Sequence, residues 1–351
     1  MNRKALPINQ WPMADQSTWN AAMATGDRFD GRGAASHWSE ASKNSIRAAY
    51  GRWLGFLEQN FPLLLNRAPV VRVTPDSIGA YIKLLNNEVA ASTTQIYIDH
   101  LLCALRVMIP SHDWHWLKPV VRRLERDVIP KAKRHRMVDS TRLFDLGIVL
   151  MVQAEVEPDA SPLEKAILYR DGLMIAVLAA RPLRRRTLSV IRLDQHIHRI
   201  GDHYCLIFSS ADTKNKQPIE YNLPVLLTAH LDRYLGHFRG LFPNAERHDG
   251  LWASVKGNPL SAGALYRRVI SRTKEAFGFS INPHLFRDCA VTTLAIRKPE
   301  HVLVGAGLLG QSDLRTIHKH YIHAQTIQAG NAHQAVISKL RRRLATRNTR
   351  R

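Results

Sequence analysis

Three residues in the last quarter of the chain could act together on a phosphate group. His284 and Arg287 are three positions apart, so on a helix they share one face. Tyr321 follows in a basic segment, residues 319–323. A guanidinium group binds two phosphate oxygens and stays charged, and a tyrosine hydroxyl that loses its proton is an oxygen nucleophile. These residue types suit attack on a phosphodiester.

The charge of the whole chain favours a polyanionic partner. The 351 residues include 50 Lys and Arg against 29 Asp and Glu, which gives a formal net charge of +21. Nucleic acid and an anionic membrane surface both fit such a charge. No apolar run reaches the about 18–20 residues of a membrane-spanning helix, so we expect no membrane insertion. Three widely spaced cysteines in apolar contexts indicate free thiols in a reducing cytoplasm.

Apolar periodicity predicts a mainly α protein with one small β-sheet. Four helices are expected in a first block, one beginning at residue 42, one at 75, one at 92 and one over 116–128. Strands are expected at residues 203–208 and 219–223, on either side of a polar turn. The other predicted helices cover residues 143–156, 162–180, 226–238, 261–277, 285–296, 301–308 and 313–321.

These patterns divide the chain into five parts. Residues 1–40 lack periodicity, which predicts a flexible N-terminal arm, and residues 41–130 form a helical domain. A basic linker at 131–140, which follows Pro130, leads to a second domain at 141–325. Residues 326–351 are expected to form a C-terminal helix and a basic tail.

The order of these motifs resembles the tyrosine recombinases, the phage-integrase family, which cut and rejoin DNA through a tyrosine–phosphate bond. The resemblance covers residues 42–325 and is strongest over 181–323. It implies a helical core-binding domain and a catalytic domain that close as a C-shaped clamp on double-stranded DNA. It further implies a bacterial cytoplasmic enzyme of a mobile element that forms a tetramer on DNA and uses no cofactor, metal or small-molecule substrate.

The resemblance also implies a role for each residue of the site. Tyr321 matches the nucleophile, and Arg184 and Arg287 match the two arginines that bind the phosphate. His284 would hydrogen-bond a phosphate oxygen or assist proton transfer. Lys214, in the turn between the predicted strands, would protonate the leaving 5′-oxygen. The register leaves Arg185 or Arg186 open as alternatives to Arg184, and Lys216 as an alternative to Lys214.

Two positions depart from the family pattern. Thr187 stands where the family usually has an acidic residue, three positions after the first arginine. Gln311 replaces the histidine of the motif Leu-Gly-His-Ser, and a glutamine amide donates a hydrogen bond but does not titrate. Tyr321 follows Gln311 by one position more than is common, and His320 occupies the usual position.

Candidate DNA contacts lie in both the linker and the first domain. The linker is expected to lie on phosphates, and Thr94 and Arg106 are candidate readers of the major groove. Steps of two and three between His318, His320 and His323 do not bring three ligands together on a helix, so we expect no metal site. The linker residues are Lys131, Lys133, Arg134 and Arg136.

Other functions remain open from the sequence. A DNA-binding protein with a recombinase fold and weak or no catalysis would fit the departures at Thr187 and Gln311. A topoisomerase-like activity would use the same nucleophile. Formation of a covalent adduct with DNA separates the binding protein from both enzymes, and strand exchange between two sites separates the enzymes from each other.

Overall fold

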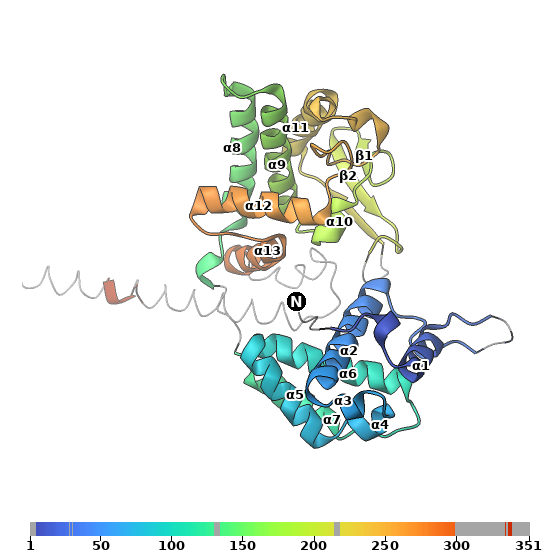
Figure 1. The fold of residues 1–351 in the computed structure, drawn as a ribbon. Coiled ribbons are helices and arrows are strands. Elements are labelled where there is room, and N and C mark those ends of the chain that lie inside the picture. The colour runs from blue at the N-terminus through green and yellow to red at the C-terminus, as the bar shows by residue number, and fades with distance from the viewer. Residues whose placement is uncertain are drawn as a thin grey trace, which may run out of the picture. The chain divides into compact units, whose positions relative to one another are not determined.

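The computed structural model describes residues 5–27, 29, 31–129, 134–213, 218–298, 334 and 336–338, with only the backbone of Arg134. The chain divides into two compact units, Met1–Lys131 and Ala132–Arg351 (Figure 1). In the described part, helices dominate and one three-stranded sheet lies in the second unit. The mainly α fold with a small sheet is therefore confirmed.

The first unit is a helical bundle. Its main helices are α2 (Glu40–Asn60), α5 (Pro75–Glu88), α6 (Ala91–Met108) and α7 (Leu117–Asp127), with short helices α3 (Pro62–Leu65) and α4 (Pro69–Arg72) between α2 and α5. Aromatic residues form the centre of its core, where Trp53 packs against Phe56 and Tyr81. Thr74 caps α5 by accepting a hydrogen bond from the backbone of Ser77.

Described residues between 5 and 27 pack into the core of this bundle, where the sequence predicted a flexible arm over residues 1–40. Helix α1 (Met13–Met23) buries Trp19, and the turn before it buries Trp11. Asp15 is 1% exposed and accepts hydrogen bonds from the Tyr50 hydroxyl, at 2.5 Å, and from the fully buried Arg72. Isolated tryptophans give no periodic pattern in the sequence, although each buries a large apolar area.

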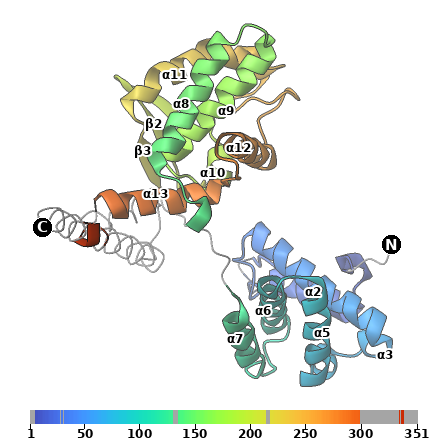
Figure 2. The same ribbon diagram turned by 90° about the vertical axis from the view of Figure 1, so that its left-hand side faces the viewer.

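The second unit contains a pair of long helices, a hairpin-built sheet and two crossing helices. Helices α8 (Ser140–Val156) and α9 (Pro162–Ala180) lie side by side, and α12 (Ala262–Phe277) and α13 (Pro283–Arg297) run across them (Figures 1 and 2). Short helix α10 (Arg185–Ser189) follows α9 and contacts α12. The antiparallel sheet has the order β1 (Ile197–Ile200), β2 (His203–Phe208), β3 (Ile219–Asn222).

Two elements of this unit differ from the sequence prediction. Strand β1 was not expected, because its sequence Ile-His-Arg-Ile places the apolar residues three apart and shows no alternation. The helix expected over residues 226–238 is divided into a 3-10 turn (Val225–Leu227), helix α11 (Thr228–Arg233) and a π-helical turn (Tyr234–Phe238). The helices expected at 301–308 and 313–321 lie outside the described residues.

Helices α8 and α9 approach each other backbone to backbone. A Cβ atom added at Gly147 would lie 2.6 Å from the carbonyl oxygen of Gly172, and one added at Gly172 would lie 2.6 Å from that of Gly147. Only glycine therefore fits at either position without displacing backbone. Because α9 ends at Ala180, this contact helps to fix the position of the chain segment that begins at Arg181.

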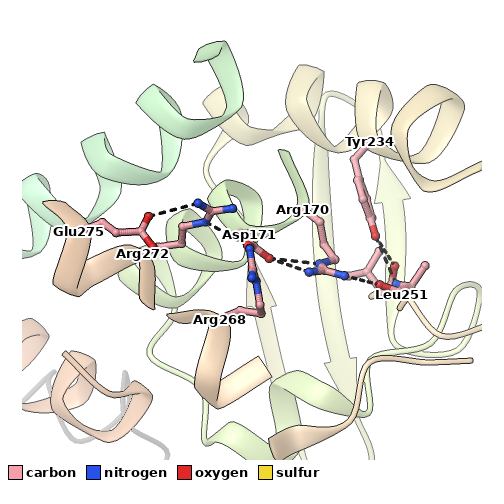
Figure 3. Close-up of polar contacts among 8 residues, drawn as sticks. Arg170, Asp171, Tyr234, Leu251, Arg268, Arg272 and Glu275 are labelled. Atoms are coloured by element: carbon pink, nitrogen blue, oxygen red, sulfur yellow. Dashed lines mark hydrogen bonds and ion pairs between the residues drawn. The ribbon is translucent and has the colours of Figure 1, made fainter. Parts of the chain in front are cut away.

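A buried carboxylate joins α9 to α12 (Figure 3). Asp171 is 1% exposed, and its Oδ1 accepts a hydrogen bond from Nη2 of the buried Arg170 at 2.8 Å. Its Oδ2 lies 2.6 Å from Nη2 of Arg268 and 3.1 Å from Nε of Arg272. Arg170 also donates to the carbonyl of Ala253 at 2.7 Å. Three arginines thus converge on one carboxylate, which holds α9, the helix that ends just before the segment 181–184, against α12.

Candidate functional site

Arg287 fastens helix α13 to the segment that follows α9. Asn282 caps α13 by accepting a hydrogen bond from the backbone of Leu285 at 2.9 Å, and Pro283 occupies the first helical position. Arg287 lies one turn further on and is 4% exposed. Its Nη1 donates to the carbonyl of Pro182 at 2.6 Å. The guanidinium is therefore held at the segment 181–184.

Arg184 lies close enough to Arg287 to lower its pKa. It is the half-buried residue that precedes α10 and has an extended backbone. Burial lowers the pKa of Arg287, and the positive charge of Arg184 lowers it further, to about 10. A pKa of about 10 leaves Arg287 charged at neutral pH. Two like charges held together at a partly buried place indicate a site for an anion.

The neighbouring arginines of α10 lie differently. Arg185 is exposed and stacks over the ring of Tyr266, with its Cζ 5.3 Å from the ring centroid. Arg186 is also exposed. Of these three described side chains, Arg184 is the one whose positive charge lowers the pKa of Arg287. Thr187 is buried and brings no charge to this place.

Strand β3 forms another side of the site. Arg181, at the end of α9, donates from Nη1 to the carbonyl of Ala180 at 2.8 Å and from Nη2 to the carbonyl of Asn222 in β3. The preceding residue, Tyr221, is half-buried. Burial raises the pKa of Tyr221, while the charges of Arg287, Arg181 and Arg184 act in the opposite direction. Sequence reasoning missed both Arg181 and Tyr221; the inward alternation of Ile219 and Tyr221 was the one available signal.

Solved structures share this arrangement of elements. XerH site-specific recombinase bound to difH, in a pre-cleavage complex, has a TM-score of 0.57 and 15% identity over 82% of this chain and 79% of that chain. Its post-cleavage complex with palindromic difH has a TM-score of 0.59 and 13% identity over 93% of this chain and 98% of that chain. The chain has the tyrosine-recombinase fold.

A third structure with the recombinase fold is lambda integrase (residues 75–356), solved as a dimer bound to a COC′ core site. It has a TM-score of 0.50 and 16% identity over 82% of this chain and 90% of that chain. The sequence itself matches no family model. No curated protein matches it either.

Of the six expected catalytic residues, the structure describes Arg184, His284 and Arg287. His284 is exposed on α13, one turn before Arg287. Lys214, Gln311 and Tyr321 lie outside the described residues, as do Lys216 and the three histidines at 318, 320 and 323.

Lys214 belongs to the connection between β2 and β3, and the structure describes this connection up to residue 213. Asp212 makes hydrogen bonds within this described part. Its Oδ2 accepts from the Ser209 hydroxyl at 2.6 Å and from the Ser209 backbone at 3.0 Å. The same oxygen lies 3.6 Å from Nε2 of His196, which is 3% exposed. These hydrogen bonds and the proximity of His196 lower the pKa of Asp212, against a smaller opposing effect of burial.

The candidate DNA contacts of the first unit differ in exposure. Thr94 is fully buried, because it lies on the same face of α6 as the buried residues Ile98, Leu101 and Leu105. This burial corrects the expectation that Thr94 reads DNA bases. Arg106 is exposed in the last turn of α6, where it lines a cavity of about 560 Å³ together with Lys118.

The basic linker is described only in part. Lys131 and Lys133 lie outside the described residues, as does the side chain of Arg134, whose backbone forms a 3-10 turn with the half-buried Arg136. Among the described residues, no three His, Cys, Asp or Glu side chains form a group suited to a metal ion. No helix in the same part of the chain is long and apolar enough to cross a membrane.

Proposed function

We propose that this chain is a site-specific DNA recombinase that cuts and rejoins double-stranded DNA through a covalent bond to Tyr321. The observation that carries the proposal is the bond of the buried Arg287 to Pro182, in the segment 181–184 that carries Arg184, within a chain of the recombinase fold. The structures of XerH and lambda integrase with this fold are complexes with DNA substrates. The formal net charge of +21 favours the same kind of partner.

The proposed reaction needs no external energy source. The Tyr321 hydroxyl gives its proton to His284 as its oxygen attacks the phosphorus, the bond to the 5′-oxygen breaks, and a 3′-phosphotyrosyl enzyme forms. Arg184 and Arg287 bind the nonbridging oxygens as these gain charge, with hydrogen bonds from His284 and Gln311. Lys214 gives its proton to the leaving 5′-oxygen. A 5′-hydroxyl of a partner duplex then attacks the phosphotyrosine, which restores a phosphodiester and frees Tyr321.

Recombination by this reaction joins two duplexes through a Holliday junction and requires four active sites. We therefore propose a tetramer on DNA, in which each chain closes around its duplex as a C-shaped clamp. The linker at 131–140 would lie on phosphates, and the apolar residues of 326–351 would dock on a neighbouring chain. Such an enzyme would serve the integration or excision of a mobile element.

A second candidate function is DNA binding without efficient cleavage. Two observations favour it: Gln311 cannot titrate where the family has histidine, and the buried Thr187 provides no carboxylate beside Arg184. In this alternative, the two arginines would bind a phosphate without promoting its transfer.

Covalent trapping separates these functions. The DNA site is first selected from a pool of random duplexes that the protein retains, and a nick is then placed beside it so that cleavage cannot be reversed. The wild-type chain should yield an adduct that survives denaturing electrophoresis, and Tyr321→Phe should yield none while binding the same DNA. Binding without an adduct in the wild type would overturn the proposed catalysis and leave the second function.

A further inference from the structure

Two arginine side chains link the segment 181–184 to distant parts of the second unit. The backbone of this segment bonds locally: the Arg181 N–H donates to Val177 of α9 at 2.8 Å, and the Leu183 N–H donates to the carbonyl of Arg181 at 2.7 Å. Pro182, which is buried between them, has no N–H to donate. Bonds from side chains are therefore needed to fix the Pro182 carbonyl against other elements.

The first link joins the end of α9 to the free edge of the sheet. Strand β3 is an edge strand, with β2 on one side. The Leu223 N–H donates to Tyr204 of β2 at 2.7 Å, and successive residues of an antiparallel ladder point their polar groups in alternate directions, so the Asn222 carbonyl points away from β2. Arg181 donates from Nη2 to this carbonyl and from Nη1 to Ala180 at 2.8 Å. Its guanidinium thus bridges α9 and β3 through charge-assisted hydrogen bonds.

The second link comes from α13. Arg287, which is 4% exposed, donates from Nη1 to the Pro182 carbonyl at 2.6 Å. The carbonyl that receives Arg287 therefore belongs to the residue next to Arg181, which is the residue anchored on β3. Because a guanidinium is a planar, rigid fork, the direction of this one N–H sets the direction of the whole group.

We propose that Arg181 is a positioning residue, which holds the Pro182 carbonyl in the place that orients Arg287 toward the reacting phosphate. This inference rests on the proposed recombinase function and adds a residue to its site. Arg181 acts through Pro182 and Arg287 and does not itself bond to DNA. Its loss should therefore slow cleavage far more than it weakens DNA binding.

The first test compares Arg181→Met with Arg199→Met by single-turnover adduct formation. Both substitutions remove one positive charge, but Arg199 lies on β1, the opposite edge strand, where its exposed side chain pairs with Asp232 at 3.3 Å. A reacting group misplaced by about 1 Å costs about a hundredfold in rate. We expect Arg181→Met to be about ten- to hundredfold slower than the control, with equal affinity for DNA. Equal rates, or a loss of affinity as large as the loss of rate, would overturn the inference.

A double-mutant cycle separates positioning from a general loss of structure. Arg287→Lys has no planar fork to orient, so adding Arg181→Met to it should slow cleavage little further. A merely destabilised unit would instead slow cleavage by the same factor in both backgrounds, which would refute the role. Arg181→Lys keeps one donor for the Asn222 carbonyl, and its rate should lie nearer to that of the wild type than the rate of Arg181→Met does.

A third measurement uses NMR on the DNA-free chain and does not depend on cleavage. Carbonyl-13C proline and 15N leucine together select the Pro–Leu pairs of the chain, which are residues 62–63, 162–163, 182–183 and 259–260. The signal of the Pro182 carbonyl is the one lost in Leu183→Ile. Arg287→Lys should move this signal in the wild-type and Arg199→Met backgrounds, but not in Arg181→Met. Comparing chains that differ at residue 287 alone cancels the direct effect of replacing the neighbour of Pro182.

The two kinds of measurement fail separately. If the wild type forms no adduct but the carbonyl signal responds as expected, the recombinase function fails and the positioning of Pro182 by Arg181 stands. If Arg287→Lys moves the signal equally with and without Arg181, or moves it in no background, the positioning role fails whatever the adduct assay gives.

Discussion

Replacing Asp171 by Asn should strongly destabilise the second unit. The substitution preserves the shape of the side chain but removes the negative charge on which Arg170, Arg268 and Arg272 converge. Arg170 is 2% exposed, so its charge would remain buried without its ion-pair partner. Removing one partner of a buried ion pair costs about 3–5 kcal/mol. For a unit of this size, about 2–4 °C per kcal/mol gives a fall of about 6–20 °C in its unfolding temperature.

Differential scanning calorimetry of the full chain measures this effect. Glu275→Gln is the matched control, because Glu275 pairs with the same Arg272 at 3.2 Å but its side chain is 56% exposed. An exposed pair contributes about 0–1 kcal/mol, so its loss should lower the unfolding temperature by no more than about 4 °C. If Asp171→Asn shifts the transition no further than Glu275→Gln does, the buried network does not hold α9 to α12 as inferred.

Three further predictions concern other parts of the chain. Asp15→Asn should destabilise the first unit by about 3–5 kcal/mol, because Arg72 is fully buried against Asp15. A calorimetric trace like that of the wild type would show that this ion pair does not hold α1 to the bundle. Burial alone would raise the pKa of Asp139, but hydrogen bonds from Thr141 and Arg297 outweigh it and lower this pKa below the ordinary 3.8. Its contribution to stability is therefore complete above pH 3.8 and is lost as the pH falls through the lowered value, so urea-unfolding free energies of Asp139→Ala and the wild type should differ near pH 7 and converge in acid. Arg287→Lys keeps a charge but loses the planar fork, so adduct formation should slow by about a hundredfold or more while gel-shift affinity changes little; an unchanged rate would exclude Arg287 from the reaction.

Local signals in the sequence predict much of the fold. Helix α9 begins at Pro162 as expected, because Ser161 and Glu164 form a capping box around its first turn. Strand β2 was predicted with its observed bounds, since it is an apolar, β-branched and aromatic run bordered by polar turns. The short strand β1 and the packing of Trp11 and Trp19 depend on tertiary contacts that no local pattern records.

The candidate site was predictable in its residue types but not in its contacts. The bonds from Arg287 to Pro182 and from Arg181 to Asn222 join segments far apart in the sequence, and a single sequence gives no measure of such proximity. Arg268 and Arg272 illustrate the same difficulty. In the sequence they belong to a basic helix that would be solvated on one face, yet both bind the buried Asp171.

The contact between Gly147 and Gly172 has a consequence for the search for distant relatives. The recombinase structures compared above share only 13–16% of their residues with this chain, so overall identity carries little information about common descent. Close approach of two helix backbones restricts both positions to the smallest residue, whatever happens to the surrounding sequence. We therefore expect homologues with the same helix packing to keep a pair of minimal residues at this spacing. The pair could identify such chains after the rest of α8 and α9 has diverged.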